Sequence, residues 1–180
     1  MSSTTVGITD DALVETERLW LRPFVDDDVT EYAAIAAKPE VTRFLGTGDP
    51  TPTGMSVARA QRWIDAWREA EADGLGVFAV VEKSTGKLIG HCGFSRLPDG
   101  RVEIDYAFDT SAWGKGYGTE AARAMVEYGS MQLGLKEFIG MAYPENYGSI
   151  GIFRKLGMVP LGSGFHHGSD LVIFSWLHYD

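Results

Sequence analysis

Hydrophobic residues in this chain recur at two spacings, and the two spacings predict different elements. Side chains repeat every second residue in a strand and about every 3.6 residues in a helix. The clearest alternation is Val102-Glu103-Ile104-Asp105-Tyr106-Ala107-Phe108, which puts Glu103, Asp105 and Ala107 on one face of a strand. The pattern predicts strands over 13–24, 76–82, 87–94, 102–108, 136–143, 158–161 and 170–179.

Apolar residues at helical spacing predict four helices between these strands. The apolar faces are Val29, Tyr32, Ala33 and Ala36; Val57, Ala60, Ile64 and Trp67; Tyr117, Ala121, Ala124, Met125 and Tyr128; and the stretch 147–156. A loop or lid is expected over 46–54, and a hairpin turn over 83–86. The order predicts a mixed α/β single domain over residues 1–180, with about 1–12 flexible.

Composition is consistent with one soluble domain in a reducing compartment. The chain has 180 residues, of which 44% are hydrophobic and 23% charged, and this is enough to bury a core. A single cysteine, Cys92, excludes an internal disulfide. No apolar run approaches the roughly 18 residues of a membrane span, and 1–11 lacks the features of a secretory signal. A cytoplasmic protein without a membrane partner is expected.

The formal charge of −9 bears on the partners. It disfavours nucleic acid, whose binding rests on basic surface. It favours cationic substrates such as amines. The alternative is that the acidity serves only to keep the protein in solution.

The most informative stretch is Trp113-Gly114-Lys115-Gly116-Tyr117-Gly118-Thr119, which follows the strand 102–108 and opens a helix. Its glycines let the backbone approach a ligand closely, and the helix start presents unpaired amides. Together they predict a phosphate or pyrophosphate site. No nucleotide-triphosphate loop is present. The dinucleotide pattern Gly116-x-Gly118-x-x-Ala121 fails on context, because too little sequence follows to build a doubly wound sheet.

This glycine run resembles the acyl-coenzyme A pyrophosphate loop of the GNAT acetyltransferase superfamily, with Gly116 and Gly118 at its two small positions. Trp113, where many members carry Gln or Arg, is typical of the branch that includes RimJ/RimL-type ribosomal-protein acetyltransferases. Further matching stretches are 16–23, 103–106, and Asn146-x-x-Ser149 through 155–158. The resemblance implies a mostly antiparallel central sheet flanked by helices and splayed between the strands 102–108 and 136–143.

The resemblance also implies acetyl-coenzyme A as the acyl donor. Its pyrophosphate would bind the amides of 114–119, with Lys115 adding charge. Arg154 and Lys155 would reach the ribose phosphate, and the alternative, slightly favoured, is that they form a polar face at the end of their helix. The strand backbone would bind the pantetheine arm and the thioester. The cofactor-binding residues so expected are Tyr106, Ala107, Phe108, Trp113, Gly114, Lys115, Gly116, Tyr117, Gly118, Thr119, Asn146, Ser149, Phe153 and Arg154.

Three residues are the catalytic candidates that the resemblance implies. Glu103 matches a strand glutamate that acts as general base. Asp105 is a second acid, which would compete as base, bind a cationic substrate or raise the pKa of Glu103 by repulsion. Phe153 occupies the position where many members carry a tyrosine acid, so Ser149 is the remaining candidate for protonating the thiolate.

Other reactive side chains are interpreted as structural. Cys92 is expected in the core. His91, His166 and His167 show no metal-ligand spacing, so no metal is expected. For the two neighbouring histidines a solvated turn is favoured over the alternative, a contact with the substrate. Trp63 and Trp67 are expected as core or wall.

The resemblance therefore predicts an N-acetyltransferase that moves an acetyl group from acetyl-coenzyme A to a primary amine by direct attack in a ternary complex. The acceptor would be a protein N-terminal amine or an amine-bearing small molecule. The alternative is a non-catalytic acyl-coenzyme A-binding sensor. A homodimer through the last strands is common in the family and stays open for this chain.

Overall fold

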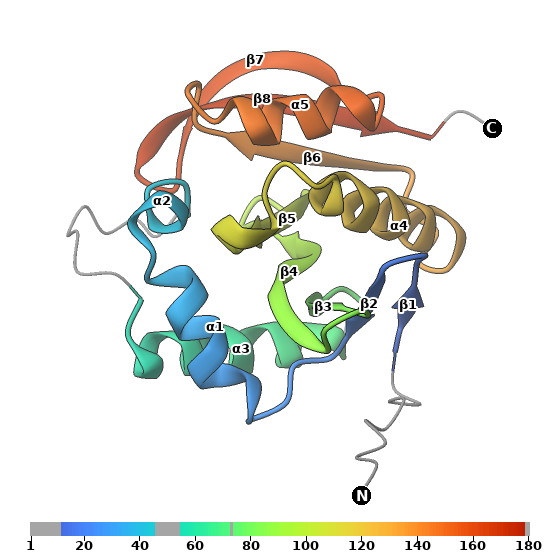
Figure 1. The fold of residues 1–180 in the computed structure, drawn as a ribbon. Coiled ribbons are helices and arrows are strands. Elements are labelled where there is room, and N and C mark those ends of the chain that lie inside the picture. Colours follow the sequence, from blue (N-terminus) through green and yellow to red (C-terminus); the bar gives the residue numbers. More distant parts are fainter. Residues whose placement is uncertain (1–11, 46–54, 73, 179–180) are drawn as a thin grey trace, which may run out of the picture.

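The computed structural model describes residues 12–45, 55–72 and 74–178 (Figure 1). The loop predicted at 46–54 and the start of the chain up to residue 11 lie outside these residues. The described elements, in chain order, are β1 (Val14–Glu15), β2 (Leu19–Arg22), α1 (Asp28–Ala36), α2 (Pro39–Thr42), α3 (Val57–Glu71), β3 (Val77–Glu82), β4 (Lys87–Arg96), β5 (Val102–Phe108), the 3₁₀ turn η1 (Thr110–Ala112), α4 (Tyr117–Met131), β6 (Glu137–Ala142), α5 (Tyr147–Lys155), β7 (Val159–His166) and β8 (Ser169–Leu177).

The strands of the described part form one sheet in the order β1-β2-β3-β4-β5-β6-β8-β7. Every neighbouring pair is antiparallel except β5 and β6, which run parallel. These two strands meet at a single residue pair, Glu103 and Ile139, whereas β4 and β5 pair from Gly90–Phe108 to Arg96–Val102. The sheet is therefore splayed at its centre, as predicted.

Helices cover both faces of this sheet (Figure 1). On one face, α4 and α5 pack with Phe94, Ile104 and Phe138 in the main core. On the other face, α1 and α3 pack over Ala79 and Leu88 in a second core. The mixed α/β class and the helices over both faces match the fold predicted from the sequence.

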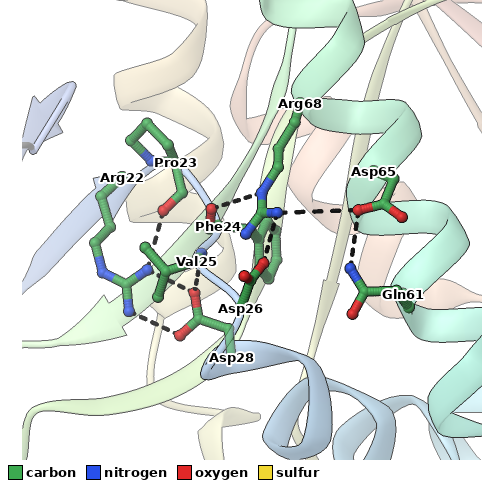
Figure 2. A network of polar contacts seen from close by, with 9 residues as sticks. All are labelled: Arg22, Pro23, Phe24, Val25, Asp26, Asp28, Gln61, Asp65 and Arg68. Carbon is green, nitrogen blue, oxygen red and sulfur yellow. Dashed lines mark hydrogen bonds and ion pairs between the residues drawn. The ribbon is translucent and has the colours of Figure 1, made fainter.

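A polar network fixes the start of α1 against α3 (Figure 2). The buried Asp28 carboxylate accepts from Arg22 Nη1 and Nη2 at 2.7 and 2.9 Å and from the Val25 amide at 2.8 Å. From α3, Arg68 donates to the Phe24 carbonyl and to Asp26, both at 2.9 Å. The network supplies hydrogen-bond partners in the turn between β2 and α1 and holds this turn against α3, which forms part of the wall of the central cavity described below.

Several predicted bounds and faces are corrected. The stretch 13–24 is two antiparallel strands, because the Thr16 hydroxyl accepts from the Leu19 amide at 3.0 Å and closes a turn. Strand β7 extends to His166 instead of ending near 161. Val57 is 52% exposed, at the first position of α3, where the helix has not yet reached the core. On α4, Ala122, Val126 and Gly129 are buried while Ala124 and Tyr128 are only partly so.

Candidate active site

A cavity of about 840 Å³ lies where β5 and β6 separate. Its walls come from β5, the glycine loop, the starts of α4 and α5, the end of β6, and side chains of α2, α3 and the β7–β8 turn. It brings together most of the predicted site residues: Glu103, Asp105, Tyr106, Ala107, Phe108, Trp113, Gly114, Gly116, Tyr117, Gly118, Thr119, Asn146, Ser149 and Phe153. A neighbouring hollow of about 870 Å³, between β1 and α4, contains neither Glu103 nor Ser149.

The glycine loop has the backbone that an anion cradle needs. Gly116 is the N-cap residue of α4, with φ 81°, and makes no side-chain capping hydrogen bond to the first amides of that helix. At Gly114, with φ 71°, an added Cβ would meet open space. At Gly118, an added Cβ would lie 2.8 Å from Ile152 Cδ1, so a larger residue would require the Ile152 side chain of α5 to move. The loop thus presents bare amides at a helix N-terminus, which fits a pyrophosphate.

Arg18 anchors this loop from the β1–β2 turn. Its Nη1 donates to the Lys115 carbonyl at 2.9 Å, and its guanidinium lies 4.4 Å from the Tyr117 ring centroid. Glu120 accepts from Arg18 Nε at 2.6 Å, from the Arg18 amide at 2.9 Å and from the Thr16 hydroxyl at 2.6 Å. Sequence reasoning missed this role, although 16–23 was among the stretches that resemble the family.

Trp113 joins the loop to the end of β5. Its indole Nε1 donates to the Phe108 carbonyl at 2.9 Å, while the residue is 48% exposed. The ring therefore fixes the strand end from which the loop departs. Two predicted cofactor contacts, Lys115 and Arg154, do not line the cavity, whereas Lys155 does.

The two carboxylates of β5 face the cavity, where the Asp105 side chain is 40% exposed. The alternation of the strand holds: Val102, Ile104 and Phe108 enter the main core, and Glu103 and Asp105 lie on the opposite face. The Glu103 side chain is 13% exposed, and burial, aided by the Asp105 charge, raises its pKa above the ordinary value. Burial would also raise the pKa of Asp105, but the facing imidazoles of His91 and His167 outweigh it and lower that pKa.

His91 is buried beside Asp105. Its Nδ1 lies 3.0 Å from the Tyr32 hydroxyl and its Nε2 lies 3.4 Å from Asp105 Oδ1. Because Tyr32 can donate to Nδ1, the proton of the ring is available at Nε2 for the carboxylate. The one signal for this contact in the sequence is a polar residue within the otherwise apolar stretch of β4.

His167 contacts the other carboxylate from the far edge of the cavity. Its Nε2 lies 3.5 Å from Glu103 Oε2, and its side chain is 39% exposed. Glu103 raises the pKa of this imidazole. His167 lies in an exposed turn, as predicted, and its side chain also lines the cavity. His166, next to it, does not line the cavity.

The start of α5 presents the predicted acid. Asn146 caps this helix by accepting from the Ser149 amide at 3.1 Å, and the Tyr106 hydroxyl donates to the Ser149 carbonyl at 3.2 Å. Phe153, 2% exposed, packs on Gly140, where an added Cβ would lie 2.5 Å from its ring. The helix is thus clamped between β5 and β6 with Ser149 lining the cavity.

The remaining candidates behave as structural residues. Cys92 is buried in the main core, as predicted, and burial raises the pKa of its thiol. Trp63 and Trp67 line the cavity wall. Within the described ranges, no cluster of three His, Cys, Asp or Glu side chains is arranged to hold a metal ion. Nor does any described helix have the length and apolarity to cross a membrane.

Comparison with known proteins identifies the class to which this fold and cavity belong. Residues 18–159 match the family model described as an acetyltransferase (GNAT) domain. The uncharacterized N-acetyltransferase p20 of Bacillus licheniformis is 32% identical over 143 residues, covering 78% of this chain and 79% of the relative. The chain belongs to the GNAT acetyltransferase family, and it is an acyl-coenzyme A-dependent acetyltransferase.

Solved structures share the fold at lower identity. A GNAT-family acetyltransferase from Bacillus anthracis superposes with a TM-score of 0.76 at 23% identity, covering 91% of this chain and 97% of that one. RimL, a ribosomal L7/L12 α-N-protein acetyltransferase solved with coenzyme A, gives a TM-score of 0.74 at 15% identity, covering 90% and 95%. These likenesses establish the architecture of the chain.

Proposed function

We propose that this protein transfers an acetyl group from acetyl-coenzyme A to a primary amine, by direct attack within a ternary complex. The observation that carries the proposal is the single cavity that joins the glycine loop, the β5–β6 opening and the carboxylates of β5. An anion cradle and a general base at the two ends of one cleft are what this reaction requires.

The donor would lie along the opening of the sheet. When bound, acetyl-coenzyme A supplies an acetyl group activated as a thioester. The amides of 114–119 would hold its pyrophosphate, and the backbone of Tyr106, Ala107 and Phe108 would hold the pantetheine arm. Ser149 would donate a proton to the departing sulfur. The bare start of α4, the partial pairing of β5 with β6 and the position of Ser149 in the cavity support these assignments.

The acceptor amine would bind beside Glu103 and Asp105. A side-chain amine with a pKa near 10.4 costs about 4 kcal/mol to deprotonate at pH 7.5, so a base is needed. Glu103 is assigned this role because its buried carboxyl has a raised pKa, which makes it the stronger base of the pair. Asp105, kept ionised, would attract the ammonium form of the acceptor. Protein N-terminal amines, as in the RimJ/RimL branch, and small amines both fit this description.

Gly116→Glu tests the donor site. A carboxylate in the loop would repel the phosphates, so calorimetric titration should show acetyl-coenzyme A affinity reduced by at least about a hundredfold. Gly86→Glu is the matched control, because Gly86 also has positive φ, 68°, and open space around its Cβ position, but lies in the β3–β4 turn. Equal affinity of the Gly116→Glu variant and the wild type would overturn the loop assignment.

A further inference from the structure

The turn between β7 and β8 carries an unexpected residue. His166 pairs with Ser169, so His167 and Gly168 form a two-residue hairpin turn, and their φ values are 51° and 77°. Two positive φ values define a type I′ turn, whose first central position is normally Asn, Asp or Gly. His167 is the one non-glycine residue with positive φ in the described part of the chain. A non-glycine residue that retains a strained backbone conformation often has a functional role.

The imidazole of His167 bridges the buried base and solvent. Its Nε2 lies 3.5 Å from Glu103 Oε2; the Glu103 side chain is 13% exposed and that of His167 39%. The other charged groups that act on this pair are Asp105 of β5, Arg101 just before β5, and His91 of β4 through Asp105. Of these groups, the His167 ring contacts the Glu103 carboxylate and also reaches the opening of the cavity.

The stoichiometry of the proposed reaction requires such a bridge. An acceptor that arrives as an ammonium ion loses two protons as the N–C bond forms and the C–S bond breaks. One proton completes the thiol of coenzyme A, and the other must leave the site. A carboxyl as buried as Glu103 needs a route by which to release that second proton before the next turnover.

We propose that His167 is a relay residue that returns Glu103 to its ionised form. Glu103 takes a proton from the amine, His167 Nε2 takes that proton from Glu103, and His167 Nδ1 releases one to water. The proposal rests on the function proposed above. His167 acts through Glu103, so it is a positioning and relay residue. Glu103 raises the pKa of the imidazole, which favours transfer in this direction.

A titration without substrate tests the coupling. The imidazole protons of the four histidines can be followed by NMR against pH in the wild type and in Glu103→Gln. The pKa of His167 should fall in the variant, because the partner charge is lost, while that of His166 should not change. The same His167 pKa in both proteins would overturn the proposal.

Turnover tests the relay itself. His167→Asn gives an Asn-Gly turn, which suits type I′, so the melting temperature should not fall. It should lower kcat by about tenfold or more without a matching rise in KM. His166→Asn is the matched control and should keep wild-type kcat.

Added imidazole separates a relay from a purely structural contact. His167→Gly keeps a turn suited to positive φ and leaves room for a free imidazole, which should restore kcat in proportion to its neutral form. Wild-type kcat in His167→Asn, or no rescue of His167→Gly, would overturn the relay. If the wild type acetylates no amine at all, the function proposed above fails instead, and the NMR titration still reports the contact.

Discussion

At the residue scale, the proposed chemistry rests on two carboxylates with opposite pKa shifts. Glu103 and Asp105 share one face of β5, yet the pKa of Glu103 is raised and that of Asp105 is lowered. The difference arises from their partners, because His91 and His167 both act on Asp105 and burial dominates at Glu103. Two acids whose environments move their pKa values apart are suited to different tasks. Here Glu103 is suited to act as a general base, and Asp105 to remain a negative charge.

Asp105→Asn tests this division of roles. The Asp105 charge raises the pKa of Glu103, so its removal should lower that pKa. Glu103 works in its ionised form, which exists above its pKa. The acid limb of the kcat/KM profile should therefore move to lower pH. The KM for the amine should rise, because the ammonium form of the acceptor no longer has the Asp105 carboxylate to attract it. Asp65→Asn, which changes an α3 carboxylate beside Gln61 and Arg68 (Figure 2), should leave both the acid limb and the KM unchanged. An acid limb at the same pH in Asp105→Asn would contradict the coupling.

The alternation of 102–108 predicted the shared face of these carboxylates, but the sequence could not predict their imidazole partners. Glu103 and Asp105 are neighbours in the strand, so local periodicity fixes their relation. His91 and His167 reach them through the pairing of β4 with β5 and through the length of the β7–β8 hairpin. Such contacts form only once the sheet is assembled. The spacing of histidines along the sequence indicates metal sites, but it does not reveal a contact between a histidine and a carboxylate on a distant strand.

At the element scale, the β1–β2 turn supports the glycine loop. The pattern predicted one strand over 13–24 because both strands are apolar at alternate positions. The Thr16 hydroxyl and the Glu120 carboxylate make a turn favourable in the middle of that stretch. Burial would raise the pKa of Glu120, but its bonds with Thr16 and Arg18 outweigh this and lower the pKa. The loop thus depends on a polar contact between the β1–β2 turn and α4.

Glu120→Gln should weaken both stability and donor binding. It removes the charge that accepts from Arg18, which in turn holds the Lys115 carbonyl. The free energy of unfolding should fall by about 1–2 kcal/mol near neutral pH. Because the folded-state pKa is lowered, this stabilisation is present above the ordinary carboxyl pKa and is lost as pH falls through the lowered value.

Chemical denaturation at several pH values measures this effect. The difference between wild type and Glu120→Gln should shrink toward acid pH, and affinity for acetyl-coenzyme A should fall alongside stability near neutrality. Glu127→Gln, an exposed position on the same helix, is the control and should match the wild type. Equal stability of Glu120→Gln and wild type at neutral pH would contradict the anchoring role.

At the scale of the whole molecule, the splayed sheet creates the cavity and its helices close it. Element order and class followed from the sequence, since long periodic stretches such as α4 and β5 carry strong local signals. The splay between β5 and β6 was predicted only from the family resemblance. It reflects how two strands pair, here at Glu103 and Ile139 alone, and the hydrophobic pattern within each strand does not indicate this. The four-residue helix α2, too short for a periodic signal, was not predicted, although its Glu40 and Val41 line the cavity.

The central claim is that this cavity acetylates amines, and thiol release from acetyl-coenzyme A tests it most directly. We would measure it for the wild type and Glu103→Gln with peptides bearing free N-termini, polyamines and aminoglycosides. The wild type should release thiol with at least one amine class. Glu103→Gln should bind the donor equally but turn over about a hundredfold more slowly, with a steeper pH dependence because only free amine reacts. Donor binding without thiol release from any amine would contradict the account and favour an acyl-coenzyme A sensor.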